Sequence, residues 1–317
     1  MGLTQVQPDM LSPGNPASNS LLNAAFDLWQ RGTSITGIAN GSSTYGPDRW
    51  YAKNSLGTNG VLRIDQTTGG VDGSKYGCSV KISTAPTAAQ ANGCELYQTL
   101  ENFNTLPFYN KTASFSIWAK ALGNVTQVGV QFFYKTTEAK VDTSIGSEQL
   151  LTVTTGGFAL AKIASQALGN SMTTSGVIGV RIRITGVSSG NTYDINYEFV
   201  VEQAMMSLGP LAPFSRAGAN IGDELMMCSR YYIASQTGIG SEAYNTGPAA
   251  REIWHFEKFP TVMRGTPSVV IGGTVASSNA GSTAVTQTSG YGFLFELDRN
   301  TSALYWIVVN YTSDAEI

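Results

Sequence analysis

Histidine is almost absent from the chain, and this absence excludes several kinds of catalytic site. His255 is the only histidine among 317 residues. A Ser-His-Asp or Cys-His site would have to use this one residue, and zinc hydrolases usually need more than one histidine. His255 lies in a segment with the pattern of a β-strand, so we expect a structural role for it. We therefore expect no enzyme, although glycoside hydrolysis by two carboxylates needs no histidine and 22 acidic residues leave it open.

Charge and long apolar runs are scarce as well. Charged residues make up 13% of the chain, with 19 basic and 22 acidic residues and a net charge of −3. A nucleic-acid partner is not expected, because no basic surface would neutralise its phosphates. Membrane insertion is not expected either, because no stretch approaches the roughly 18 apolar residues of a membrane span.

Cysteine is limited to Cys78, Cys94 and Cys228, and none of them belongs to a CxxC motif. Three cysteines cannot all pair within one chain, and free or buried thiols are the simpler interpretation for a protein folded in a reducing cytosol. Cys78 and Cys94 can pair only if their strands are neighbours, which the sequence leaves open. We expect neither a cofactor nor a metal ion.

The chain is rich in short segments of alternating apolar and polar residues. The clearest are residues 113–120, 128–134, 178–185 and 193–201. Such alternation gives each strand one apolar face and one solvated face, as in antiparallel sheets, and glycine-rich turns separate the segments. The sequence therefore predicts an all-β protein built on a jelly roll or β-sandwich. Residues 158–168 fit either a helix or a strand.

One segment keeps a helical period instead. Its apolar residues stand at i, i+4, i+7 and i+11: Ile221, Leu225, Cys228 and Tyr232. Asn220 is a plausible N-cap, and Asp223 and Glu224 fall in the first turn, where the helix dipole favours acids. We expect this helix to end the first β domain.

These patterns predict three parts. Residues 1–20 have no periodicity and form an extended N-terminal arm, residues 21–234 form the jelly-roll domain, and residues 235–317 form a small C-terminal β domain. A core of about 80 residues is marginal by itself. We therefore expect the C-terminal domain to gain stability from its neighbours, and the family resemblance given below implies that these are the other copies in a homotrimer.

Several segments resemble bacteriophage tail-fibre and virion-associated proteins, and they occur in the same order as in that family. They are residues 21–34, then Asp48, Arg49 and Trp50, then residues 98–105 and 114–120, and finally residues 213–216, 221–225 and 228–232. In addition, residues 259–267 resemble a motif of phage tail C-terminal domains, and residues 4–11 resemble fibre attachment arms. The resemblance implies a jelly roll like that of carbohydrate-binding modules, carried on a phage virion.

The resemblance also implies a function and partners. The first expectation is a tail fibre or receptor-binding subunit, and the alternative is a capsid decoration protein or head fibre. A polysaccharide depolymerase ranks lower, because such enzymes commonly carry long β-helix repeats and no 20–50-residue repeat is visible here. The protein would be made in the host cytoplasm and reside on the virion. The arm would contact other virion proteins through Thr4, Val6, Met10 and Leu11.

The sequence departs from the family at three places. Residues 206–209 replace an acidic turn, and Ala24 and Ala25 replace a glycine-containing pair. In related sugar-binding jelly rolls, acids near the first strand hold calcium, and here only Asp27 is suitably placed. No metal site is therefore expected.

Aromatic residues supply much of the buried area in a sandwich with so little charge. We expect Trp29 and Trp50 in the core and Arg31, Asp48 and Arg49 in ion pairs or turn caps. Trp118 falls on the polar face of its strand. It has three open alternatives: to contact the second domain, a neighbouring copy or a ligand.

A receptor contact is expected in residues 240–317, because the first domain is joined directly to the arm. A sugar needs an aromatic plane with hydrogen-bonding groups beside it. The candidates for a glycan contact are Trp306, Trp254, Tyr244 and Glu242, with polar groups from an expected loop at residues 276–290. For Trp306, packing against a trimer mate is the alternative.

Overall fold

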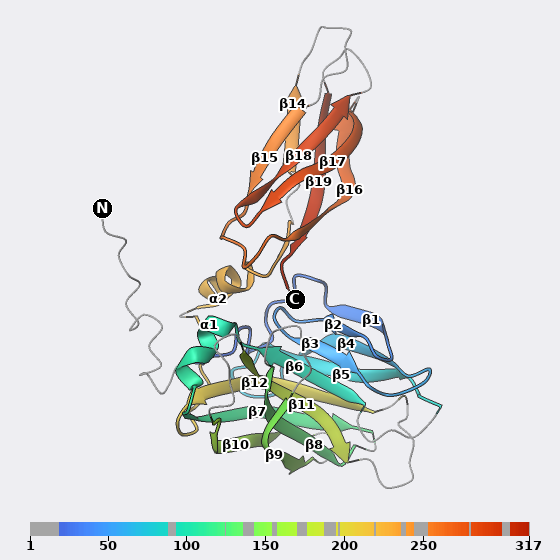
Figure 1. The fold of residues 1–317 in the computed structure, drawn as a ribbon. Helices are drawn as coiled ribbons and strands as arrows, with labels where there is room; N and C mark the ends of the chain where they lie inside the picture. The colour runs from blue at the N-terminus through green and yellow to red at the C-terminus, as the bar shows by residue number, and fades with distance from the viewer. Residues whose placement is uncertain are drawn as a thin grey trace, which may run out of the picture. The chain divides into compact units, whose positions relative to one another are not determined.

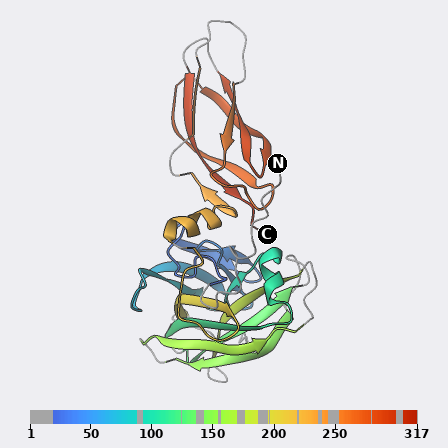
Figure 2. The ribbon, with the colours of Figure 1, turned by 90° about the vertical axis from the view of Figure 1, so that its left-hand side faces the viewer.

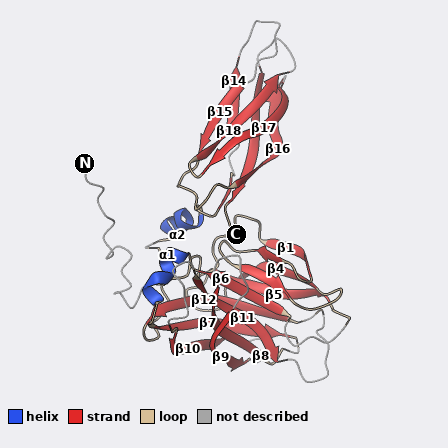
Figure 3. Cartoon of the chain, in the orientation of Figure 1, coloured by secondary structure: helices blue, strands red, loops and turns tan. Residues whose placement is uncertain are grey.

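The computed structural model describes residues 19–87, 93–123, 125–135, 143–153, 157–169, 176–186, 195, 197–218, 220–235, 239–243, 253–278, 280–299 and 305–316. Strands dominate this part of the chain, with short helices between them (Figure 3). Two compact units are present, Met1–Glu224 and Leu225–Ile317. The first unit ends inside a helix, ten residues before the domain break expected after residue 234. None of the described helices has the length and hydrophobicity to cross a membrane.

The first unit is a β-sandwich of two six-stranded antiparallel sheets (Figures 1 and 2). The first sheet has the order β1 (Ser34–Ala39), β4 (Val61–Thr68), β5 (Tyr76–Thr84), β12 (Glu198–Leu208), β7 (Thr112–Leu122) and β10 (Ala159–Ala167). The second sheet has the order β2 (Ser43–Tyr45), β3 (Tyr51–Asn54), β6 (Cys94–Thr99), β11 (Val177–Gly186), β8 (Gln127–Lys135) and β9 (Thr143–Thr152). Successive strands alternate repeatedly between the sheets, as in a jelly roll. The predicted fold class is confirmed, and the ambiguous residues 158–168 form strand β10.

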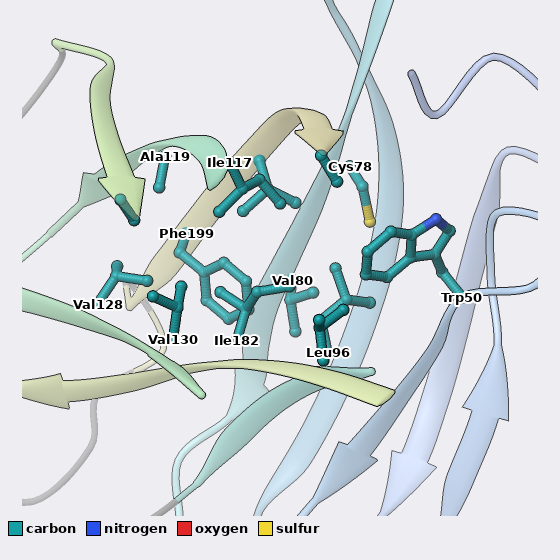
Figure 4. Close-up of a cluster of buried hydrophobic side chains, with 14 of the residues drawn as sticks. Trp50, Cys78, Val80, Leu96, Ile117, Ala119, Val128, Val130, Ile182 and Phe199 are labelled. Atoms are coloured by element: carbon teal, nitrogen blue, oxygen red, sulfur yellow. The ribbon is translucent and has the colours of Figure 1, made fainter. Parts of the chain in front are cut away.

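Apolar side chains of the two sheets meet between the layers. Figure 4 shows Ile117 and Phe199 of the first sheet opposite Val130 and Ile182 of the second. Trp50 is fully buried in this core, as expected. The three cysteines are buried and form no disulfide, and burial raises the pKa of Cys78 and Cys94 well above the usual value for a thiol.

The opening segment that resembles the phage family is folded around one asparagine. Asn23 has a left-handed backbone (φ 49°), and its amide donates hydrogen bonds to the carbonyl oxygens of Leu28 (2.8 Å) and Asp48 (3.1 Å). The indole N–H of Trp50 donates to the carbonyl oxygen of Asn23. The carboxylate of Asp48 in turn accepts two hydrogen bonds from Gln30. Residues of two separate motifs therefore form one buried polar network.

Helices α1 (Asn102–Thr105) and α2 (Ile221–Cys228), with a 3-10 turn at Leu106–Phe108, interrupt the strands. The predicted N-cap of α2 is confirmed, because the side-chain oxygen of Asn220 accepts hydrogen bonds from two backbone N–H groups of the first turn. The expected apolar stripe is only partly buried. Ile221 and Leu225 are 49% and 38% exposed, whereas Glu224 is fully buried.

Glu224 is buried because Arg216 binds it. The guanidinium of Arg216 lies 2.9 Å from Oε2 of Glu224 and forms a second ion pair with Oδ2 of Asp27. Asp27 is also nearly fully buried, and the other oxygen of each carboxylate has no hydrogen-bond partner among the described residues. The acid that the family resemblance places near a calcium site is thus paired with an arginine here.

The Arg216→Met variant is expected to lose about 3–5 kcal/mol of unfolding free energy, because two buried carboxylates would lose the cation that binds them. Denaturant unfolding measures this change. The control is Arg63→Met, which breaks the surface pair between Arg63 and Asp65 and should cost less than about 1 kcal/mol. Equal losses in the two variants would contradict a structural role for the buried cluster.

The second unit contains two further antiparallel sheets. Its third sheet joins β13 (Tyr232–Ala234), β19 (Tyr305–Asp314), β14 (Ile239–Ala243) and β16 (Ser268–Ser278), with both β14 and β16 paired to β19. Its fourth sheet has the order β15 (Ile253–Lys258), β18 (Gly292–Arg299) and β17 (Ala280–Ser289). The expected loop at residues 276–290 is therefore wrong. Residues 276–278 end strand β16 of the third sheet, and residues 280–289 form strand β17 of the fourth sheet, where Val285 packs against the core despite the Ser/Thr-rich composition.

An aromatic cluster forms the core of the second unit. The ring centroids of Phe293 and Tyr311 lie 4.8 Å apart, and Phe259 contacts both rings. The single histidine lies on strand β15, as expected, with Nε2 of His255 3.6 Å from a carboxylate oxygen of Glu257. Burial, together with Glu257, raises the pKa of Tyr311 to about 12.

The raised pKa of Tyr311 predicts that the second unit loses stability in alkali. The folded state holds the phenol proton more tightly than the unfolded state, so the contribution is complete below pH 10 and is lost as the pH rises to about 12. The expected slope is at most about 1.4 kcal/mol per pH unit. Thermal unfolding of the Tyr311→Phe variant should show a shallower decline over this range than that of the parent protein, and identical profiles would contradict the assignment.

Candidate functional site

The predicted contact residues of the C-terminal unit are only partly placed by the structure. Trp306 on β19 and Glu242 on β14 are directly opposite each other in the antiparallel pairing of these two strands. Trp254 belongs to a different sheet, on β15. The remaining predicted residues lie outside the described part of the chain: Tyr244, Thr4, Val6, Met10 and Leu11.

Trp254 begins an exposed apolar row. Trp254 and Phe256 are 50% and 55% exposed on the same face of the edge strand β15. Their paired positions on β18 are Glu296 and Leu294. Trp254 is therefore accessible to a partner, as expected, and its role in binding stays a prediction.

Trp118 lies on the outer face of the first sheet, away from the core. Its paired positions are Leu160 on β10 and Glu202 on β12. The carboxylate of the fully buried Glu202 accepts hydrogen bonds from the N–H groups of Gly70 and Val71, each at 2.9 Å. This carboxylate thus holds a turn against the sheet beside Trp118, which is itself partly buried.

A row of aromatic side chains crosses the outer face of the second sheet. Tyr45, Tyr51 and Tyr97 occupy paired positions on β2, β3 and β6. The rings of Tyr51 and Tyr97 are stacked, with centroids 5.1 Å apart and planes 5° apart. Tyr45 and Phe133 extend the row at either end, each with a centroid 5.4 Å from its neighbour. We call these four side chains the tyrosine row.

A glycine makes space for the far end of the tyrosine row. The ring of Phe133 lies over Gly179, where a Cβ atom would be 2.5 Å from Cζ of Phe133 and 2.5 Å from the backbone oxygen of Gln98. Phe133 and Tyr97 are almost completely buried although they face away from the core. These two rings form the floor of the face, and the partly buried Tyr45 and Tyr51 form its more accessible end.

Charged side chains surround the tyrosine row. The guanidinium of Arg31 lies 4.9 Å from the ring centroid of Tyr45, and the ammonium group of Lys135 lies 5.8 Å from that of Tyr51. Such cation–π contacts hold positive charge against an aromatic plane.

Two acids of this face are occupied by Arg183. Its guanidinium binds both carboxylate oxygens of Glu148, at 2.5 and 2.6 Å, and approaches Glu95 at 4.0 Å. The hydrogen bonds that Arg183 donates to Glu148 raise the pKa of Arg183. The hydroxyl of Tyr97 donates to Glu95 at 2.7 Å. Arg183 is therefore a structural cation that orders both acids.

Arg181 has different surroundings. Arg181 is on β11, between Tyr97 on β6 and Gln131 on β8, and it is paired with both residues. Its guanidinium donates to the side-chain oxygen of Gln131 and approaches the hydroxyl of Ser144 at 3.4 Å. The Nε atom of Arg181 is buried and has no hydrogen-bond partner in the described structure.

The tyrosine row is not among the predicted contact sites, although the sequence contains one signal for it. The alternation in residues 178–185 places Arg181 and Arg183 on the solvated side of their strand. A second signal is that several strands of the second sheet carry an aromatic residue at an outward-facing position. Examples are Tyr51 on β3, Tyr97 on β6 and Phe133 on β8.

Metal binding has no support in the residues that the structure describes, which contain no group of three or more His, Cys, Asp or Glu side chains arranged to hold an ion.

Comparisons with known proteins give distant structural likenesses alone. No protein-family model and no curated protein matches the sequence. Among solved structures, the C-terminal family 22 carbohydrate binding module of Clostridium thermocellum Xyn10B is 11% identical, with 55% of this chain and 93% of that chain covered and a TM-score of 0.35. A CBM4 structure is 13% identical, covering 59% of this chain and 97% of that one, with a TM-score of 0.36.

The enzymatically active domain of bacteriophage CBA120 tailspike protein 4 is 9% identical over 60% of this chain, with a TM-score of 0.33. This chain spans 21% of that tailspike chain. Likenesses this distant support no conclusion about what the protein binds.

The close approach at Gly179 predicts that Gly179→Ala destabilises the first unit. The added methyl group meets the Phe133 ring and a backbone oxygen, so a loss of about 1–3 kcal/mol is expected from overpacking. Gly265→Ala is the control, because a Cβ atom there meets nothing within 4 Å. Denaturant unfolding compares the two variants, and an unchanged Gly179→Ala protein would contradict the described position of the ring.

Proposed function

We propose that the protein is a non-catalytic component of a bacteriophage virion, a tail fibre or receptor-binding subunit that binds a surface glycan. The proposal starts from the ordered resemblance over residues 21–232, which names the class of protein. The observation that carries the binding function is the tyrosine row, because it combines aromatic planes with polar and charged groups on one face of a sheet.

The residues of the family motifs have a structural role in this chain. Asn23, Asp48 and Trp50 form the buried network, and Arg216 neutralises Asp27. Residues in such roles specify the sandwich and not its ligand. Recognition must then use side chains outside these motifs, and the tyrosine row consists of outward-facing residues on four strands.

The tyrosine row has the groups that sugar binding requires. A sugar ring presents an apolar face that packs on an aromatic plane, and its hydroxyl groups need hydrogen-bonding partners at the edge of that plane. Tyr51 is partly exposed at the accessible end of the row, with one face of its ring stacked on Tyr97 and with Tyr45 against it edge-on. The hydroxyl group of Tyr45, the ammonium group of Lys53 and the amide of Gln131 lie on the same face of the sheet.

Capsid decoration is the second candidate function, and the exposed row on β15 favours it. Trp254 and Phe256 expose apolar surface on an edge strand, which suits contact with another protein. Both functions can use the same sandwich, so the position of the protein on the particle separates them. Cryo-electron microscopy that places it on capsid faces would contradict the fibre proposal, and density at the tail would support it.

Adsorption of the purified full-length protein to host cells tests the glycan contact. Tyr51→Ala removes the partly exposed ring of the tyrosine row. Adsorption is expected to weaken about tenfold, which corresponds to a loss of roughly 1.4 kcal/mol of binding free energy. Tyr109→Ala is the matched control, because Tyr109 is 45% exposed in the same unit but is not part of the row.

The same assay tests the predicted contact in the C-terminal unit through Trp254→Ala. Melting curves must show that each variant is folded. Normal adsorption by Tyr51→Ala together with lost adsorption by Trp254→Ala would move the contact to β15. Normal adsorption by both variants would contradict both positions.

A further inference from the structure

We infer that the glycan bound at the tyrosine row is acidic, and that Arg181 binds its anionic group. The inference rests on the proposed function and adds the chemical class of the ligand. The anionic group is a carboxylate, sulfate or phosphate carried by a sugar, because all three present the oxygen pairs that a guanidinium binds.

The first argument is the charge of the face. Its described side chains include five cations and two acids: Arg31, Lys53, Lys135, Arg181, Arg183, Glu95 and Glu148. The whole chain has the opposite balance, with a net charge of −3. An excess of positive charge on one face of an otherwise acidic protein attracts an anionic ligand.

The second argument is the unequal pairing of two neighbouring arginines. Arg183 has a bidentate ion pair with Glu148 and a second acid nearby. Among the described residues, the side-chain hydrogen bonds of Arg181 go to the neutral Gln131 and Ser144, and no carboxylate forms an ion pair with it. The two described acids of the face, Glu95 and Glu148, lie within ion-pair distance of Arg183, so the positive charge of Arg181 remains for a ligand.

The third argument is the buried Nε atom of Arg181, which has no hydrogen-bond partner in the described residues. An unpaired buried donor is costly, and a guanidinium that reaches an oxyanion gains charge-assisted hydrogen bonds. Gln131 and Ser144 fix the guanidinium from one side. The buried Nε shows that the guanidinium is not saturated by the protein, and a bound anionic group would accept hydrogen bonds from its outer N–H groups.

The position of Arg181 relative to the aromatic planes fits a sugar polymer. Tyr51, Tyr97 and Arg181 occupy one register row on three adjacent strands. Adjacent strands lie about 4.8 Å apart, so the backbones at Tyr51 and Arg181 are separated by about 10 Å. A disaccharide spans this distance, with one ring on Tyr51 and the anionic group of the next sugar at Arg181.

Matched pairs of polysaccharides test the inference on the full-length protein. The pairs are polygalacturonate and its carboxyl-reduced form, dextran sulfate and dextran, and phosphomannan and its dephosphorylated form. Isothermal titration calorimetry is expected to show that the acidic member of at least one pair binds and that its neutral counterpart does not. The pair that responds identifies the anionic group.

Three variants assign the effect to Arg181. Arg181→Gln is expected to weaken binding of the acidic polymer at least about tenfold, because a charge-assisted hydrogen bond is lost. Arg181→Lys keeps the charge without the planar fork and should fall between the parent and Arg181→Gln. Arg63→Gln makes the same charge change on the first sheet, where Arg63 is paired with Asp65, and should bind like the parent.

Several outcomes overturn the inference. Equal binding of acidic and neutral members, parental affinity of a folded Arg181→Gln variant, or no binding to any polymer each contradicts an acidic ligand at Arg181. The proposed glycan contact survives these results if Tyr51→Ala still reduces adsorption to cells. Normal adsorption by Tyr51→Ala would instead contradict the contact at the tyrosine row itself.

Discussion

The first sandwich depends on a single cation placed between two buried acids. Arg216 holds Asp27 from the opening segment and Glu224 from helix α2, and these two acids are separated by almost the whole unit in sequence. Because both carboxylates are buried, neither is tolerated without the guanidinium. The interaction joins the first turn of α2 to the opening segment of the sandwich. It also explains why a short helix exposes apolar residues on its surface and buries a glutamate.

Other buried polar side chains of the first unit also have hydrogen-bond partners inside the protein. Asn23 uses its amide to bond two backbone oxygens, and Glu202 binds the backbone N–H groups of a glycine-containing turn. These residues fix loops against the sandwich where no strand pairing is available. Consequently, sequence motifs that resemble a family can be maintained by folding alone. The surfaces that distinguish partners are then free to use other positions.

Much of the fold was accessible from alternation, and the failures have identifiable causes. Strands β7, β8 and β11 were predicted because one of their faces enters the core. The end of β16 and the whole of β17 were expected to be a loop, because their small polar residues show little apolar periodicity. Pairing with β19 and with β18, respectively, makes them strands. The tyrosine row was missed for a related reason. Register between distant strands brings Tyr51, Tyr97 and Arg181 together, and no local pattern encodes register.

The tyrosine row and the apolar row on β15 differ in the chemistry around them, and this difference argues for different partners. On the second sheet, the aromatic rings are surrounded by long cations, ordered acids and a guanidinium with an unsatisfied donor. A ligand there must bring hydrogen-bonding groups and negative charge, as a charged sugar does. On the edge strand β15, Trp254 and Phe256 expose mainly apolar area. Burying this area against another protein surface yields the largest hydrophobic free energy. These two kinds of surface fit the proposed role, in which the protein joins a glycan to a protein assembly.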